Sequence, residues 1–318
     1  MKHSKLLKII FAGTPDFSAK HLIQIIRAKY KIVGVLTKTD KPSGRGKLIL
    51  ESPVKKIAKK HKIPIFQPEI ENITQLHTQL YELHADLMIV VSYGLILPEN
   101  ILNMFPLGCI NVHASLLPRW RGATPIQSAI LYGDSITGIS IIKMEKGIDT
   151  GKILCSSSCK IKNTDTSASL QDKLSVISYK TTLLALKMLS LSYDHYVSQS
   201  KLITYSSKIK KQDAQLNWSK DAIILERCIR AFNPWPISFF KIDNKLIRVW
   251  KANVIMQYHN NIYKEGEIIL INKNGLQIQT KRNVLNIIKL QLPGKTIMHA
   301  HNLKNFKKKF LIPRMQLV

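Results

Sequence analysis

Two polar side chains, Asn111 and His113, close a short apolar segment and are of types that can do chemistry. Side chains alternate between the two faces of a strand, so a strand over residues 109–113 points both to the same face. The apolar run 87–91 predicts a buried strand just before it. Open α/β sheets build active sites where such strands meet the following loops. An amide donor beside an imidazole suits oxyanion stabilisation and proton transfer.

A third polar side chain, Asp149, lies in a turn bounded by glycines, directly after another predicted strand. Strand ends of neighbouring βα units meet at one edge of a sheet, so Asp149 can face Asn111 and His113. Such a trio suits acyl-type transfer, in which the carboxylate holds the imidazole or takes the nucleophile's proton. Two alternatives stay open: Asp149 caps the turn, and His113 is a hydrogen-bonded core histidine. A serine nucleophile is not expected, because no nucleophile elbow surrounds Ser115.

The polar loop 38–47 is the next candidate for a function. It places four basic residues among glycines and a proline, a composition that suits contact with a phosphate backbone. A solvated surface loop is the alternative. The loop is not a nucleotide-binding P-loop, since no Gly-Lys-Ser/Thr ending is present, and the turn at 13–15 lacks the glycine pattern of a dinucleotide site.

Strands alternating with helices must position these residues. The pattern predicts an α/β fold with a doubly wound, mostly parallel sheet and right-handed crossovers. Asp16 is expected to cap a first helix, and Ser52-Pro53 opens another. Further predictions are strands at 8–13, 32–36, 63–66, 87–91, 138–144 and 152–154, and helices at 73–83, at 125–131 and along the apolar positions 170, 174, 177, 184 and 188.

The pattern changes after residue 190. A polar stretch rich in serine and lysine indicates a linker. Beyond it, residues 245–255, 266–271, 276–280 and 284–290 are predicted strands, and no comparably strong helix is expected among them. We therefore expect a catalytic domain over 1–190, a linker over 191–209 and a smaller, mainly β domain, a small barrel, over 210–318.

The charge is strongly positive, with 48 Lys and Arg against 20 Asp and Glu and a formal net charge of +28. This excess favours a polyanionic partner. Coding bias is the alternative, because the chain is also rich in Asn and Ile. Residues 268–318 contain ten Lys or Arg and no Asp or Glu. A bias that adds lysines does not remove every acid, so we expect this region to contact nucleic acid.

Other features exclude several classes of protein. No segment of the 318 residues approaches the roughly 20 apolar residues of a membrane span. The apolar stretch 9–12 is too short for a signal peptide, so a cytoplasmic protein is expected. Cys155 and Cys159 lack a second pair of metal ligands and are expected to be small buried residues on one strand face. No metal is expected.

The motifs around these residues resemble the 10-formyltetrahydrofolate-dependent formyltransferases. The resemblance rests on Asn-Val-His at 111–113, Ser-Leu-Leu-Pro at 115–118, Arg-Gly at 121–122 and Asp-Thr-Gly at 149–151. Residues 11–17, 44–47, 52–55 and 230–236 extend it over nearly the whole chain, least clearly after Trp250. It implies a Rossmann-like catalytic domain followed by an OB-like β-barrel.

The resemblance also implies the activity and the roles of particular residues. The reaction would move a formyl group from 10-formyltetrahydrofolate to the α-amino group of methionine on initiator tRNA, for translation initiation. Asn111, His113 and Asp149 would be catalytic. Ser115, Leu116, Leu117 and Pro118 would line the folate site, and Arg45 and Lys47 would bind tRNA. We expect the enzyme to act as a monomer, away from membranes.

Three other classes of protein share some of these features but explain them less well. A formyltransferase acting on glycinamide ribonucleotide would share the trio but should end near residue 200. A sugar-nucleotide formyltransferase could carry a similar C-terminal barrel, but its substrate gives no reason for the acid-free basic tail. A non-enzymatic RNA-binding module would not need Asn111, His113 and Asp149 in this arrangement.

Overall fold

The computed structural model of the chain describes residues 6–43, 48–69, 76–193, 195–242, 245–256, 262–305 and 311–317. The chain divides into two compact units. The first comprises Met1–Pro125, Ile136–Lys160 and Gln171–Ser206, and the second comprises Ile126–Ser135, Ile161–Leu170 and Ser207–Val318. Over the described ranges, no helix is both long enough and apolar enough to cross a membrane.

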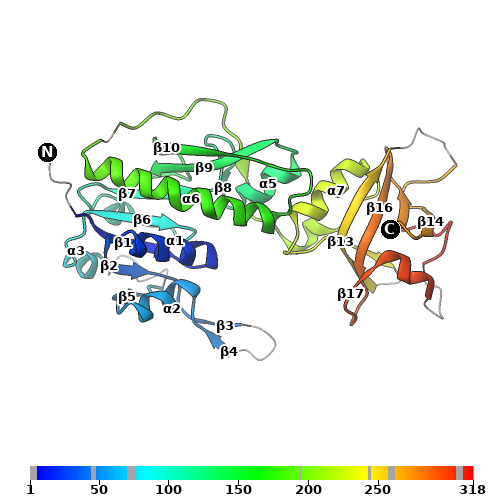
Figure 1. Ribbon diagram of the computed structural model, residues 1–318, viewed down its shortest axis with the longest axis horizontal. Coiled ribbons are helices and arrows are strands. Elements are labelled where there is room, and N and C mark those ends of the chain that lie inside the picture. Colours follow the sequence, from blue (N-terminus) through cyan, green and yellow to red (C-terminus); the bar gives the residue numbers. More distant parts are fainter. Residues whose placement is uncertain are drawn as a thin grey trace. The chain divides into compact units, whose positions relative to one another are not determined.

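A seven-stranded sheet forms the centre of the first unit, in the order β10-β9-β7-β6-β1-β2-β5 (Figure 1). Strands β1, β2, β5, β6 and β7 are parallel, whereas β9 runs antiparallel to β7, and β10 to β9. Because β1 lies between β2 and β6, the strand order reverses beside it, as in a doubly wound sheet. The predicted α/β fold class is confirmed.

The first unit contains these elements: β1 (Lys8–Gly13), α1 (Asp16–Arg27), β2 (Lys31–Leu36), β3 (Lys41–Ser43), β4 (Leu48–Leu50), α2 (Pro53–Lys60), β5 (Ile65–Phe66), α3 (Leu76–Tyr81), β6 (Leu87–Val91), α4 (Glu99–Leu102), β7 (Cys109–His113), β8 (Arg121–Gly122), β9 (Ile136–Lys143), β10 (Ile153–Lys160) and β11 (Tyr205–Ser206). Helices α5 (Pro125–Leu131) and α6 (Ser167–Ser190) contribute residues to both units.

Helices cover both faces of this sheet. Ile10, Met88 and Val90 share one apolar cluster with buried residues of α3 and α4. The alternate residues of the same strands, including Phe11 and Ile89, are also buried, and α1 contacts β1 and β6. Burial on both faces explains why these strands are continuous apolar runs rather than alternating ones.

The second unit is a helix followed by a curled antiparallel sheet (Figure 1). Its elements are η2 (Lys211–Ala214), α7 (Ala222–Ala231), β12 (Phe239–Ile242), β13 (Lys245–Ile255), β14 (Ile268–Asn272), β15 (Gly275–Gln279), β16 (Val284–Gln291), β17 (Ile297–His299) and η3 (Ala300–Asn305). Leu225 and Ile229 of α7 pack into one core with Val249 and Ile287 of the sheet. The predicted β domain is confirmed, and α7 before it was not predicted.

Two local predictions were wrong. Asp16 does not cap α1: Pro15 occupies the N-cap position, without a side-chain hydrogen bond, and Asp16 is the first helical residue. A carboxylate there still interacts favourably with the helix dipole. Cys155 and Cys159 are only half-buried, because β10 lies at the edge of the sheet. Burial still raises the pKa of Cys155 to about 11, so its thiol stays protonated near neutrality.

Candidate active site

Strand β7 presents Asn111 and His113 on one face, as the alternation predicts. In the middle of the sheet, Asn111 pairs with Val90 of β6 and Ile142 of β9, and His113 pairs with Ser140. Both side chains reach the same carboxylate, that of Asp149. Residues separated along the chain therefore meet at one point, as their positions at strand ends predict.

The Asp149 carboxylate makes three close contacts. Its Oδ1 accepts a hydrogen bond from Nδ2 of Asn111 at 3.0 Å. Its Oδ2 accepts one from the backbone N–H of Gly122 at 2.8 Å and lies 3.4 Å from Nδ1 of His113. A carboxylate only accepts hydrogen bonds, so it fixes the Asn111 amide with its NH2 group toward Asp149.

A backbone carbonyl orients the imidazole of His113 from its other side. The ring is 5% exposed, and its Nε2 lies 2.9 Å from the carbonyl oxygen of Trp120. Since that oxygen can only accept, Nε2 carries the proton and Nδ1 faces Asp149. The ring is thus held by contacts on both nitrogens, and a second proton on Nδ1 would lie between the ring and the carboxylate.

A cavity of about 570 Å³ opens beside this trio. Asn111 and Asp149 line it, together with residues 95–99, Leu102 and the turn 144–151. Most of these side chains are apolar, and two of them, Ile96 and Ile148, are 89% and 65% exposed. An apolar cavity with a few convergent polar groups is the usual form of a small-molecule site.

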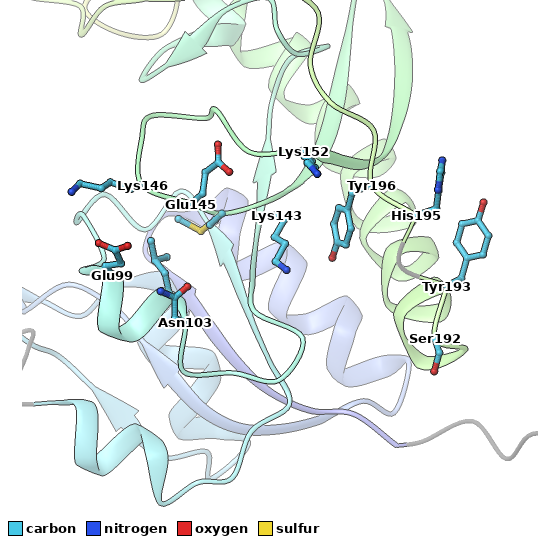
Figure 2. Close-up of a pocket in the computed structure, with 12 residues that line it drawn as sticks. Glu99, Asn103, Lys143, Glu145, Lys146, Lys152, Ser192, Tyr193, His195 and Tyr196 are labelled. Atoms are coloured by element: carbon cyan, nitrogen blue, oxygen red, sulfur yellow. The ribbon is translucent and has the colours of Figure 1, made fainter.

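A second cavity, of about 710 Å³, shares Glu99, Leu102 and residues 144–146 with the first (Figure 2). Figure 2 shows Lys143 and Tyr196 facing one another, and the Lys143 ammonium lies 5.7 Å from the centroid of the Tyr196 ring. None of the predicted catalytic residues lines this cavity. Within the described residues, no group of three or more His, Cys, Asp or Glu could hold a metal ion.

Two glycines allow the Asp149 turn to lie against its neighbours. A Cβ at Gly122, where φ is +110°, would stand 2.4 Å from the carbonyl oxygen of Ser206. A Cβ at Gly151 would stand 1.7 Å from the carbonyl oxygen of Lys143. Neither position can carry a side chain unless backbone moves.

The other residues singled out in the sequence lie in different surroundings. Ser115 and Leu117 are 1% and 7% exposed, whereas Leu116 and Pro118 are half-buried. The Leu117 N–H donates to Oγ of Ser140, so this segment is tied to β9. None of the four lines the 570 Å³ cavity. Arg45 and Lys47 fall outside the described residues.

The first residues of the basic loop 38–47 contact helix α2 and the residues after β5. Lys55 of α2 contacts Asp40 in an ion pair and donates to Gln67 at 2.7 Å. A hydrogen bond from Lys55 is the main cause that holds the pKa of Asp40 below its usual value. Neither this cluster nor the contacts around Asp149 that involve Trp120, Gly122 and Gln199 are predictable from the sequence motifs.

Comparison with known proteins identifies the same family over nearly the whole chain. Residues 7–186 match the family described as formyl transferase, and residues 208–308 match its C-terminal domain. The methionyl-tRNA formyltransferase of Buchnera aphidicola subsp. Baizongia pistaciae is 58% identical over 313 residues, covering 98% of this chain and 97% of that protein. That of Buchnera aphidicola subsp. Schizaphis graminum is 48% identical, covering 96% and 97%.

Solved structures agree on the fold. WlaRD, a sugar 3N-formyl transferase solved in the presence of dTDP and 5-N-formyl-THF, superposes with a TM-score of 0.65 at 18% identity, covering 92% of this chain and 100% of its own. HypX from Aquifex aeolicus, solved with tetrahydrofolic acid, gives a TM-score of 0.64 at 13% identity, covering 94% of this chain and 47% of its own.

The chain therefore belongs to the formyl transferase family, and it is an enzyme. Within that family it groups with the methionyl-tRNA formyltransferases, at identities of about half or more over almost its full length.

Proposed function

We propose that this enzyme transfers the formyl group of 10-formyltetrahydrofolate to the α-amino group of methionine on initiator tRNA. The observation that carries the proposal is the contact of the Asp149 carboxylate with both Asn111 and His113 at the wall of an apolar cavity. The 58% identity to a methionyl-tRNA formyltransferase supports the choice of acceptor.

The folate would occupy the 570 Å³ cavity. Its apolar side chains suit a flat ring system, and it is also lined by Asn111 and Asp149, where the formyl group must react. Two neighbours of the same fold are described with tetrahydrofolic acid or 5-N-formyl-THF. We also propose that the folate extends beyond this cavity to the segment 115–118, which does not line it. Half-buried Leu116 and Pro118 would contact the folate there, and buried Ser115 and Leu117 would fix the segment.

The trio would act on the addition and the collapse of a tetrahedral intermediate. The methionine nitrogen attacks the formyl carbon, and the carbonyl electrons move onto oxygen. The free N–H of Asn111 donates to that oxyanion, and the positive charge of a protonated His113 stabilises it, since Asp149 orients both groups. The attacking nitrogen loses one proton to the Asp149 carboxylate. The bond from carbon to N10 then breaks, that proton is passed to N10, and tetrahydrofolate leaves.

The tRNA would bind to the basic loop, through Arg45 and Lys47, and to the domain 210–318. One feature of the second unit supports this domain as a polyanion site. Lys251, Lys289 and His299 are directly paired across β13, β16 and β17, and all three are exposed. The two lysines carry like charges at paired positions, and these charges repel each other. A phosphate backbone would neutralise them.

We propose that the enzyme acts in the cytoplasm, as a monomer.

A comparison of three acceptors tests this function. Purified enzyme with 10-formyltetrahydrofolate should formylate initiator Met-tRNA, and His113→Ala and Asp149→Ala should abolish most of the turnover. Transfer to an amino sugar nucleotide or to glycinamide ribonucleotide, without transfer to Met-tRNA, would overturn the proposal.

A further inference from the structure

The side chain of Gln199 lies between the Asp149 turn and a buried arginine. It comes from the segment between α6 and β11, far from the turn in sequence. Its Nε2 donates to the carbonyl oxygens of Asp149 and Gly151, at 2.8 and 2.7 Å. Its Oε1 accepts from Nε and Nη2 of Arg121, at 3.0 and 2.7 Å. Both ends of the amide are therefore used.

Arg121 determines which way this amide faces. A guanidinium can only donate and a backbone carbonyl can only accept, so Oε1 must face Arg121 and NH2 must face the turn. Arg121 is itself fixed: it is 6% exposed, and its N–H donates to the carbonyl of Thr204 at 2.9 Å. Its carbonyl accepts from Oγ of Ser206 at 3.1 Å. The amide cannot rotate without losing its contacts at both ends.

The Asp149 turn needs support of this kind. Asp149 has φ of +53°, in the left-handed region, which is uncommon for residues other than glycine although aspartate adopts it more readily than most. Such a backbone persists where its surroundings hold it. Its carboxylate contacts Asn111 through Oδ1 and His113 through Oδ2. A small rotation of the backbone would therefore break one contact or both.

We propose that Gln199 is a positioning residue for formyl transfer. Arg121 orients the Gln199 amide, and the amide holds the Asp149 turn in the conformation that lets the carboxylate contact Asn111 and His113. Gln199 does not line the 570 Å³ cavity, so it acts through Asp149 rather than on substrate. The inference rests on the proposed formyl transfer.

The most direct variant is Gln199→Glu. A glutamate keeps the contact with Arg121 but turns a carboxylate oxygen toward two carbonyl oxygens. The Asp149 turn should shift, and kcat for Met-tRNA should fall by about 10- to 100-fold, with KM for both substrates within about threefold. Gln199→Met, which has the same length without hydrogen bonds, should also lower kcat. Gln79→Glu, the same charge change on an exposed residue of α3, should leave kcat unchanged.

A double variant separates positioning from a general structural role. In an Asp149→Asn background, Gln199→Glu should lower kcat little further, since its effect passes through the carboxylate. A full additional loss in that background, or wild-type kcat in Gln199→Glu alone, would overturn the inference. So would failure of both the Glu and Met variants to fold. If the wild-type enzyme does not formylate Met-tRNA, the proposed function fails instead.

Discussion

The Asp149 carboxylate is the side chain on which the site depends most, because it contacts two groups of different chemistry. It aims the Asn111 amide with one oxygen and faces the His113 ring with the other. Preorganised donors of this kind act where charge develops in the transition state. On the proposed mechanism, Asn111→Ala should raise the barrier to formyl transfer by about 3 kcal/mol. The rate constant of a single turnover measures this loss. A loss of less than threefold would remove Asn111 from the oxyanion site.

Gly122 should tolerate no side chain. The added Cβ of Gly122→Ala meets the carbonyl of Ser206, and the backbone must move the N–H that binds Asp149. We expect about 1–3 kcal/mol of lost stability and a larger loss of kcat. Gly294→Ala is the matched control, since Gly294 also has positive φ, +70°, but nothing lies within 4 Å of an added Cβ. Chemical unfolding and kcat check both variants, and an active Gly122→Ala would contradict this view.

Helices α1 and α6 are joined by a buried histidine. Nδ1 of His21 lies 2.7 Å from the carbonyl oxygen of Phe17, and Nε2 lies 2.5 Å from Oγ of Ser178 on α6. The carbonyl requires the proton on Nδ1, so Nε2 accepts from the Ser178 hydroxyl. Burial is the main cause that lowers the pKa of His21 from 6.5 to about 4.

This histidine should make the first unit sensitive to acid. The unfolded chain takes up the proton first, so the stability from neutral His21 is complete above about pH 6.5 and lost as the pH falls toward 4. The full loss should be about 3 kcal/mol, of which about 2 kcal/mol should appear between pH 7 and pH 5. Unfolding by urea at these two pH values measures that part. His21→Gln should flatten this part of the pH dependence, whereas the exposed His61→Gln should not. An unchanged slope in His21→Gln would assign the acid sensitivity to other groups.

Elements with strong local signals were predictable from sequence. The apolar runs of β1 and β6 were found because both faces are buried, and Ser52 accepts the expected capping bond from the Lys55 N–H at 3.0 Å. Helix α7 was not predicted, although Asp221 precedes it and Leu225 and Ile229 repeat at helical spacing. Ten residues without a strong cap give a weak pattern.

The site was predictable only in part, for a physical reason. Asn111, His113 and Asp149 can be recognised in the sequence itself, from their residue types and their positions at the ends of predicted strands. Gln199 carries none: it lies in a polar stretch predicted as a linker, and its role depends on a contact 50 residues away. The carbonyl of Trp120 and the N–H of Gly122 are backbone groups, which no residue type reveals.

The excess of positive charge is a property of the whole chain, and its distribution decides whether it is functional. Lys251→Glu with Lys289→Glu reverses two exposed, paired charges. We expect weaker Met-tRNA binding and a salt slope lower by about 2, because each phosphate contact contributes about one unit. Lys180→Glu with Lys187→Glu, two exposed lysines of α6, is the charge-matched control. Equal losses in the two proteins, titrated from low to moderate salt, would indicate a general field without a binding face.

Asn111, His113 and Asp149 are proposed to act as a unit, and single-turnover formylation of Met-tRNA tests this directly. Rate constants are needed for the wild type, for the alanine variants of Asn111, His113 and Asp149, and for the triple variant. We expect each single variant to lose at least about 100-fold. The triple variant should lose far less than the product of the three, because groups that act together are not additive. Near wild-type formylation by Asp149→Ala would contradict the account.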